Sequence, residues 1–279
     1  MVILAAVLLA RAVAEPAPPI IKVTADNTVI RESCTLLIDA GTVIDDADQN
    51  GVIHIAADGI TIEWAPETIL RGCAQGTSPD SMTGVGISIR NHSNVTIRGG
   101  TVSGFKVGVE AEHTDGLTLD GTVFIDNFRQ RLRSTPQAED SADWLYPHHD
   151  DAREWTTRWG AAASVRHATA ITIRNIRVRD GQNGILLHRV NDSSAYDNDV
   201  SFLSGWGIAM FRSNRNMISR NAADYCIRGH SEGVYNRGQD SAGLLAFEQC
   251  SDNAFVENSA THGGDGFFGF AGLEALGEK

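Results

Sequence analysis

The second half of the sequence contains histidine, arginine and tyrosine residues whose chemistry suits proton removal next to a carboxylate. A guanidinium that neutralises a carboxylate acidifies the adjacent C–H bond, and an imidazole or a phenol can then accept the proton. The residues that we expect to line one groove are His188, Arg189 and Arg212, with His230, Tyr235 and Arg237 at one end.

A second group of such residues follows Tyr146. His148, His149, Asp150 and Asp151 are consecutive, and their side chains bind metals or exchange protons. Adjacent residues of an extended chain point in opposite directions, so at most two of these four share a side. We therefore expect His148 or His149 above the groove and assign no metal ligands.

Three of the five tryptophans lie near this group, at Trp144, Trp155 and Trp159. Tryptophan provides a large, rigid surface that can stack on the apolar face of a sugar ring. The alternative is that these rings only hold a loop against the body of the protein. The sequence leaves both interpretations open.

A repeat shows which elements must position these residues. A glycine followed by alternating apolar residues recurs, and these glycines are Gly86, Gly108, Gly184, Gly207, Gly243 and Gly266. Gly86 and Gly108 are 22 residues apart, and the steps between the later glycines, from Gly184 to Gly266, are 23, 36 and 23. A second series, Asn175, Asn198, Asn221 and Asn258, has steps of 23, 23 and 37. One insertion explains the long step in both series.

A period of 22–23 residues with about three short strands per unit is typical of a parallel β-solenoid. Each coil buries its apolar side chains only by stacking on the next, about 4.8 Å away. We expect residues 15–52 to form a cap and first coil, and residues 53–279 to form a β-helix that continues beyond the C-terminus. Excursions from the period are expected near residues 129–160 and 228–242. The stacked asparagines are expected to be structural.

The pattern resembles the pectate-lyase-like superfamily of right-handed parallel β-helices, in its group of carbohydrate-binding proteins and sugar hydrolases. The segment Gly184-Ile185-Leu186-Leu187-His188-Arg189-Val190-Asn191-Asp192 is similar to coils of alginate C5-epimerases and NosD-type proteins. Pro147-His148-His149-Asp150 partly resembles the Asp-Pro-His-Asp motif of those epimerases, with Tyr146 in place of the leading aspartate and one extra histidine. The resemblance implies an all-β solenoid fold and a polysaccharide partner.

Related chemistries fit this sequence less well. Hydrolases of this fold use clustered aspartates and a Gly-His-Gly turn, and Gly229-His230-Ser231 is close to the latter. The carboxylates that could serve a hydrolase are Asp240, Glu248 and Asp265. A calcium-dependent lyase needs several converging carboxylates. Glu110, Glu112 and Asp115 could meet that need for Ca2+, or could form a solvated acidic face.

The strand phase predicts which side chains face outward. If the residue after each glycine points inward, the residue four after it points outward, which places His188, Phe211, Phe247 and Phe270 in one column. The following positions, Arg189, Arg212 and Glu248, lie at the strand ends. Outward phenylalanines on successive coils are unusual for a solvated surface. Either a sugar chain lies along them or the 129–160 excursion covers them.

Composition and charge narrow the class of protein. The net charge of -12 argues against nucleic-acid binding. Residues 129–237 nevertheless contain 15 Arg and 12 acidic residues, which fits either a nearby anionic ligand or an ordinary solvated surface. Apolar residues 2–10 and small residues 12–14 predict a signal peptide over residues 1–14, and no segment is long enough to span a membrane. Export would permit Cys34–Cys73 and Cys226–Cys250 disulfides; four buried thiols are the alternative.

These observations predict a secreted or periplasmic β-helix that acts on an anionic polysaccharide, as a lyase or a C5-epimerase. The rival is a non-catalytic module that binds a glycan or another surface, as in a NosD-like accessory protein or an adhesin. The enzyme requires His188, Arg212 and His230 or Tyr235 to converge on one sugar ring. The binding module requires only the repeat and the aromatic residues.

Overall fold

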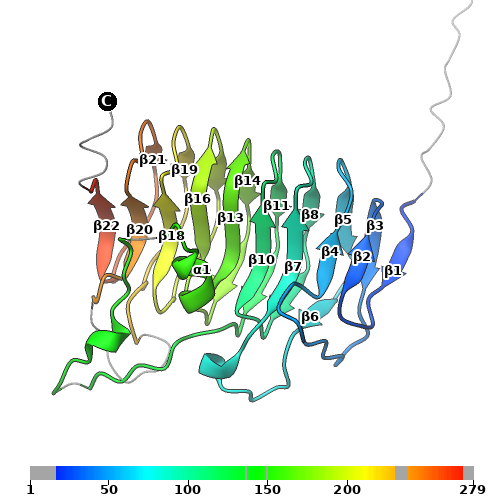
Figure 1. Ribbon diagram of the computed structural model, residues 1–279, viewed down its shortest axis with the longest axis horizontal. Coiled ribbons are helices and arrows are strands. Elements are labelled where there is room, and N and C mark those ends of the chain that lie inside the picture. Colours follow the sequence, from blue (N-terminus) through cyan, green and yellow to red (C-terminus); the bar gives the residue numbers. More distant parts are fainter. Residues whose placement is uncertain (1–16, 136, 149, 230–237, 273–279) are drawn as a thin grey trace, which may run out of the picture.

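The computed structural model describes residues 17–135, 137–148, 150–229 and 238–272. In this part of the chain, short strands follow one another along a single long axis, from the N-terminal coils at one end to the C-terminal coils at the other (Figure 1). The predicted signal peptide of residues 1–14 lies outside the described residues. No helix among the described residues has the length and apolar character needed to cross a membrane.

The strands form three parallel sheets. Sheet A has the order β1 (Ile20–Lys22), β3 (Cys34–Leu37), β5 (Thr61–Trp64), β8 (Thr96–Arg98), β11 (Thr118–Asp120), β14 (Thr172–Arg174), β17 (Ser194–Tyr196), β19 (Met217–Ser219) and β21 (Ala254–Val256). Sheet B has the order β2 (Thr28–Ile30), β4 (Ile53–Ile55), β7 (Val85–Arg90), β10 (Val107–Glu112), β13 (Ala161–Thr169), β16 (Ile185–Asn191), β18 (Trp206–Phe211), β20 (Ala242–Phe247) and β22 (Asp265–Phe270). Sheet C contains β6 (Ile69–Arg71), β9 (Thr101–Ser103), β12 (Val123–Ile125) and β15 (Arg177–Arg179).

Each strand pairs in parallel with the equivalent strand of the next coil, so sequence-distant residues become neighbours along the axis. In sheet B, for example, Ile185 pairs with Ile208 and His188 pairs with Phe211. The chain is a right-handed parallel β-helix. The predicted fold class is therefore confirmed.

The inward side chains form one continuous core along the solenoid. The residues that follow the repeated glycines, such as Ile87, Val109, Ile185 and Ile208, belong to it. Stacking removes these apolar side chains from water, which no coil could do alone. The predicted inward phase of sheet B is confirmed.

The repeated glycines are required by the close approach of successive coils. A Cβ atom on Gly184 would lie 2.3 Å from the carbonyl oxygen of Gly207, and one on Gly207 would lie 2.5 Å from that of Gly243. Both distances are shorter than real Cβ contacts, so a larger residue at Gly184 or Gly207 would require the neighbouring backbone to shift. In the coil of β13 the same column holds Ala162, whose carbonyl oxygen lies 2.5 Å from a Cβ built on Gly108.

Asparagine amides form a ladder at the turn after sheet A. Asn198 Nδ2 donates to Asn221 Oδ1, and Asn221 Nδ2 donates to Asn258 Oδ1, each at 2.9 Å. The prediction that Asn175 belongs to this ladder was wrong. Arg177 and Asp199 form a β-bridge, so the residue equivalent to Asn198 is Ile176. Asn175 is exposed and donates to Asp120 instead, since this coil is one residue shorter.

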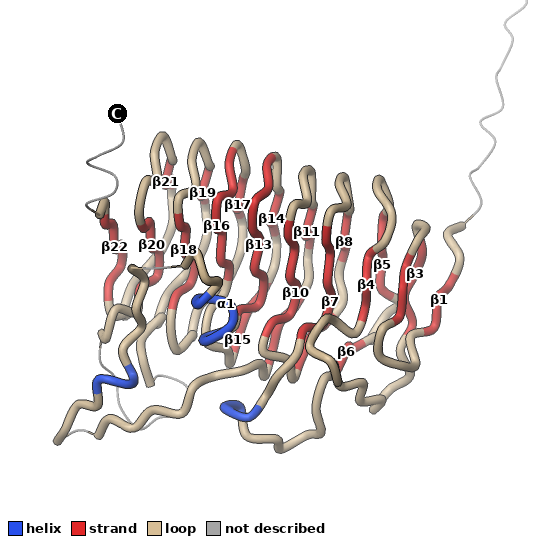
Figure 2. The backbone as a smooth tube through the Cα atoms, viewed as in Figure 1, coloured by secondary structure: helices blue, strands red, loops and turns tan. Residues whose placement is uncertain are grey.

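Two segments leave the solenoid on the same side, as the loop trace in Figure 2 shows. The shorter contains a 3-10 helix, η1 (Pro79–Ser81), between β6 and β7. The longer runs between β12 and β13 and contains a 3-10 helix, η2 (Ser141–Asp143), and an α-helix, α1 (Glu154–Trp159). We call residues 129–160 the excursion. Residues 230–237 of the second predicted excursion lie outside the described residues.

All four cysteines are free thiols, and Cys34 and Cys226 are buried in the core. Burial raises the pKa of the Cys34 thiol to about 11 and that of Cys226 to about 12. The structure thus agrees with the second interpretation of the cysteines for these two residues.

Candidate functional site

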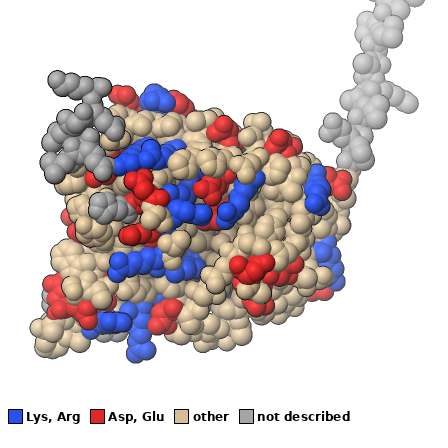
Figure 3. Space-filling view, viewed as in Figure 1, with Lys and Arg blue, Asp and Glu red and all other residues tan. Residues whose placement is uncertain are grey.

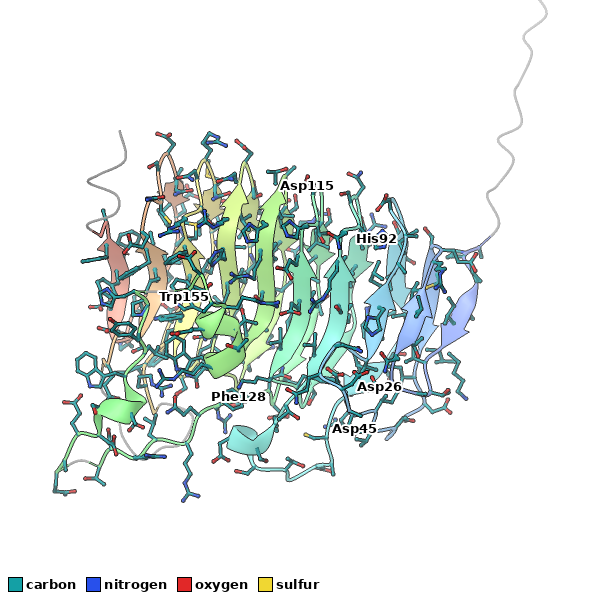
Figure 4. The ribbon with its side chains drawn as sticks, in the orientation of Figure 1. Asp26, Asp45, His92, Asp115, Phe128 and Trp155 are labelled. Atoms are coloured by element: carbon teal, nitrogen blue, oxygen red, sulfur yellow. The ribbon has the colours of Figure 1, made fainter. Side chains whose placement is uncertain are left out.

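The excursion covers the outer face of sheet B. A second apolar cluster lies there, separate from the core, and it includes Leu145, Trp155, Trp159, Leu186, Trp206, Phe211, Leu245 and Phe247. The Trp155 and Trp206 ring centroids are 4.7 Å apart, and Trp155 also meets Phe211 edge-on. Figure 4 shows Trp155 in front of the strands of sheet B. The predicted column of outward phenylalanines exists, and the excursion covers two of them.

This packing corrects several predicted sugar contacts. Phe211 and Phe247 are fully buried, and Trp155 and Trp159 are 1% and 0% exposed, so none of these rings presents a face to a sugar. The aromatic groups instead attach the excursion to the solenoid. Trp144 and Phe270 are 41% and 40% exposed and are the predicted rings that a ligand could reach.

A buried arginine fixes the start of the excursion. Arg228 donates to the carbonyl oxygens of Asp143 and Ser204 at 2.9 and 2.6 Å, and to Gln130 Oε1 at 3.0 Å. Burial lowers the pKa of Arg228 to about 10, although the charge of Asp143 opposes this. The excursion is therefore joined to the solenoid by hydrogen bonds at one end and by aromatic packing at the other.

His188 lies beneath the excursion in a hydrogen-bonded cluster. Its Nδ1 bonds Asp150 Oδ2, which also accepts from Arg166 Nη1 at 2.7 Å. Asp150 Oδ1 accepts from the backbone N–H of Trp155 at 2.8 Å, so the carboxylate is held from several sides. Arg166 and His188 are paired residues of neighbouring strands, β13 and β16. Asp150 thus orients the imidazole with Nε2 away from the carboxylate.

The charge state of His188 follows from its surroundings. Burial lowers the pKa of His188 below its ordinary value and the Arg166 charge acts in the same direction, while the Asp150 hydrogen bond opposes them. The ring is 2% exposed and stacks on Phe211 at a centroid distance of 4.9 Å. A neutral imidazole with a carboxylate on Nδ1 can accept a proton at Nε2.

Two guanidiniums meet one carboxylate next to His188. Arg189 Nη2 lies 3.2 Å from Asp151 Oδ1, and Arg212 Nη1 lies 3.3 Å from both Asp151 oxygens. The Asp151 side chain is 60% exposed. Partial burial disfavours its ionisation, but the Arg189 hydrogen bond and the two positive charges outweigh this and lower the pKa of Asp151. Two guanidiniums and one carboxylate therefore form an ion-pair cluster at the surface, beside His188.

One turn of the coil positions these arginines. The residues that follow the outward column, His113, His167, Arg189, Arg212 and Glu248, all have φ between 49° and 53°. This left-handed conformation is uncommon for residues other than glycine, but it recurs at many turns of this chain and is a feature of the coils. The shared turn brings side chains of successive coils to the same edge, where the His113 and His167 rings stack at 5.0 Å.

Further charged groups surround the site on the face seen in Figure 3, where basic and acidic side chains lie side by side. Glu110 is buried and binds both Arg90, at 2.7 Å, and Arg153. Arg153 also lies 3.5 Å from Glu112. Because guanidiniums already bind both glutamates, these carboxylates do not fit the open calcium site that the sequence left as an alternative.

The remaining predicted residues are distributed as follows. His148 contacts Tyr146, Phe247 and Phe270 through its ring and lies over the aromatic column. Glu248 is 6% exposed, and among the described residues its Oε2 has no hydrogen-bond partner. His149, His230, Tyr235 and Arg237 lie outside the described residues. The structure brings together His188, Arg189 and Arg212 of the predicted set.

Sequence reasoning missed the roles of Asp150, Asp151, Arg166 and His167. The glycine that marks six coils of sheet B, from β7 to β22, is absent from β13, where Ala162 takes its place. The glycine pattern that located His188 therefore did not locate this strand. The 22-residue step between the paired Arg166 and His188 was the available signal.

Comparison with known proteins finds a family that is similar to part of the chain. Residues 152–266 match the family described as periplasmic copper-binding protein (NosD). This segment is NosD-like. The NosD-like segment includes His188, Arg189 and Arg212, and it begins just after Asp150 and Asp151. No curated protein matches the chain.

Several solved structures are similar. An alginate lyase from Paenibacillus has a TM-score of 0.31 and 11% identity, over 89% of this chain and 98% of that chain. The A-module of a mannuronan C-5 epimerase from Azotobacter vinelandii has a TM-score of 0.32 and 10% identity, over 91% and 88%. A surface protein and adhesin from Streptococcus pneumoniae has a TM-score of 0.24 and 10% identity, over 91% of both.

Proposed function

We propose that this β-helix acts on a polysaccharide that contains uronate, as a lyase or a C5-epimerase, in the periplasm or outside the cell. The observation that carries the proposal is the neutral His188, oriented by Asp150, beside the two guanidiniums of Arg189 and Arg212. The periplasmic description of the matched family supports the location.

The chemistry follows from the positions of these groups. Arg189 and Arg212 would bind the uronate carboxylate, which stabilises the negative charge that develops when the adjacent C5–H bond breaks. His188 Nε2 would accept that proton. If the C4–O bond then breaks, the electrons of the C5–H bond form the C4–C5 double bond, and the leaving oxygen takes a proton from the His188 imidazolium or from water. If a proton returns to C5 from the opposite face, the sugar is epimerised.

Access to His188 requires local movement, because its ring is 2% exposed. The exposed side of the cluster is formed by Asp151 and Arg189, whose side chains are 60% and 40% exposed. A sugar chain would therefore approach from this side, while Trp155 and Asp150 remain buried.

The matched family is described as copper-binding, which raises the question of whether the residues of this chain could bind copper. Copper prefers imidazole and sulfur ligands whose lone pairs converge. The His113 and His167 rings are stacked 5.0 Å apart with an angle of 18° between their planes, so their lone pairs lie in two separate, nearly parallel planes. Among the described residues, the group of three metal-ligand types with close donor atoms is Asp26, Asp46 and Asp48, which offers only oxygen. These residues do not fit copper.

The test is turnover of acidic polysaccharides by wild type and by H188N, R212Q and R215Q. We expect H188N to lose about 100-fold or more of the turnover, a typical loss for a general base, while binding persists. Arg215 pairs with Asp192 on another turn and is exposed, so R215Q is a matched control that should behave like wild type.

Absorbance of unsaturated uronate ends would report a lyase, and NMR of the sugar configuration would report an epimerase. Full turnover by H188N would refute the assignment of the base. Binding by wild type without any turnover, and its loss in R212Q, would favour the non-catalytic module.

A further inference from the structure

Asp151 binds the two arginines that, in the proposed function, bind the carboxylate of the ligand. Its carboxylate lies 3.2 Å from Arg189 Nη2 and 3.3 Å from Arg212 Nη1. The Arg212 side chain is only 14% exposed, and its guanidinium lies 5.1 Å from the centre of the Phe211 ring. Arg212 is thus held in place while the carboxylate that it binds is on the surface.

The neighbouring residues show that this contact can be released alone. Asp150 is buried and bound to Arg166, His188 and the Trp155 backbone, and Arg153 is bound to Glu110. These contacts hold the excursion on both sides of Asp151. Exposed ion pairs contribute little stability, so the Asp151 side chain can leave the arginines while the excursion stays closed.

We propose that Asp151 is a tethered competitor, which occupies the carboxylate position of the anionic glycan until the glycan displaces it. This inference rests on the proposed function, since it concerns the same two arginines. A uronate carboxylate is the same chemical group as the Asp151 side chain and can make the same paired contacts with both guanidiniums. A neutral sugar offers no group that could replace the carboxylate.

The tether makes the site selective for chains of uronate over single sugars. A group on a short tether acts at an effective concentration of about millimolar. A single uronate must exceed that concentration to displace Asp151, whereas a polymer makes further contacts and offers another carboxylate with each repeat. The apparent affinity for the glycan is proportional to the fraction of sites that Asp151 leaves free.

The experiment compares wild type, D151N and D192N by titration calorimetry with oligouronates, using oligogalacturonate, oligomannuronate and oligoguluronate of six residues. We expect D151N to bind its ligand about threefold to tenfold more tightly than wild type, because the amide lacks the competing charge. Asp192 is a matched control, since it is 53% exposed and pairs with Arg215 of the next coil. D192N should bind like wild type.

Each result is decisive. If the wild type binds and D151N binds no more tightly, the competitor is refuted and the proposed function stands. The competitor is supported if D151N binds more tightly than wild type and the double variant D151N/R212Q loses this gain. It is also supported if D151N binds measurably and wild type does not. If neither wild type nor D151N binds any oligouronate, both proposals are overturned. Circular dichroism and melting curves of each variant would confirm that the solenoid is intact.

Discussion

At the residue scale, His188 combines burial with one oriented hydrogen bond, and the two act on its pKa in opposite directions. Burial and the Arg166 charge lower the pKa, and the Asp150 hydrogen bond raises it. The balance lies below the ordinary value of about 6.5, so the imidazole is neutral at pH 7. This is the form that a proton acceptor needs.

A pH dependence follows from this balance. Because the pKa of His188 is lowered, kcat/KM should be constant near pH 7 and should fall only on the acid side, with a midpoint below about 6.5. D150N removes the interaction that raises the pKa, so its midpoint should move to lower pH. NMR titration of the His188 ring would check both values. A midpoint above 6.5 in the wild type would contradict the lowered pKa.

Sequence analysis found His188, Arg189 and Arg212 because the outward column follows directly from strand alternation. It could not assign Asp150 and Asp151, because adjacent residues in a loop have no fixed direction until the loop has a path. The structure places both carboxylates on the site, Asp150 on the histidine and Asp151 on the arginines. Two neighbouring aspartates therefore have different tasks, which residue type alone does not reveal.

At the element scale, the excursion depends on tryptophan packing for its position over sheet B. Trp155 is buried against Trp206 and Phe211, whereas Trp144 of the same excursion is 41% exposed. The sequence left sugar stacking and loop attachment open for both. They separate only when burial is known.

Alanine substitution should distinguish the two tryptophans. W155A should lower the free energy of unfolding by about 3–5 kcal/mol, the range for large aromatic residues removed from a packed core. W144A should change it by no more than about 0.5 kcal/mol, as is usual for a surface position. Denaturant unfolding followed by circular dichroism measures both. Equal losses of stability in the two variants would contradict the assigned packing.

The period of the strands could be predicted, but the register could not be predicted throughout. Glycines mark the coils because their Cβ positions are filled by the next coil's backbone, as at Gly184 and Gly207. The rule fails at Ala162, where the coils tolerate a methyl group, and the asparagine count fails at Asn175, where one coil is a residue shorter. Both failures are local adjustments that leave the apolar pattern intact.

At the scale of the whole molecule, the net charge has the opposite sign to the two arginines of the site. The chain has a net charge of -12, and the candidate ligand is a polyanion. Long-range repulsion should therefore oppose the approach of the glycan, while Arg189 and Arg212 attract it only at contact. The two effects act over different distances, so salt should separate them.

Salt should accelerate both association and dissociation. The Debye length falls from about 30 Å at 0.01 M to about 8 Å at 0.15 M ionic strength, which removes the repulsion between the acidic surface and the approaching chain. The association rate constant should rise severalfold over this range. The dissociation rate constant should also rise, because the contacts with Arg189 and Arg212 are partly exposed and weaken with salt. Surface plasmon resonance with an immobilised oligouronate separates the two rate constants.

The double variant R189Q/R212Q is the control. Its association rate constant should still rise with salt, whereas its dissociation rate constant should lose most of its salt dependence. Slower association of the wild type at higher salt would instead show that the local arginines govern approach, and that the net charge of the molecule does not.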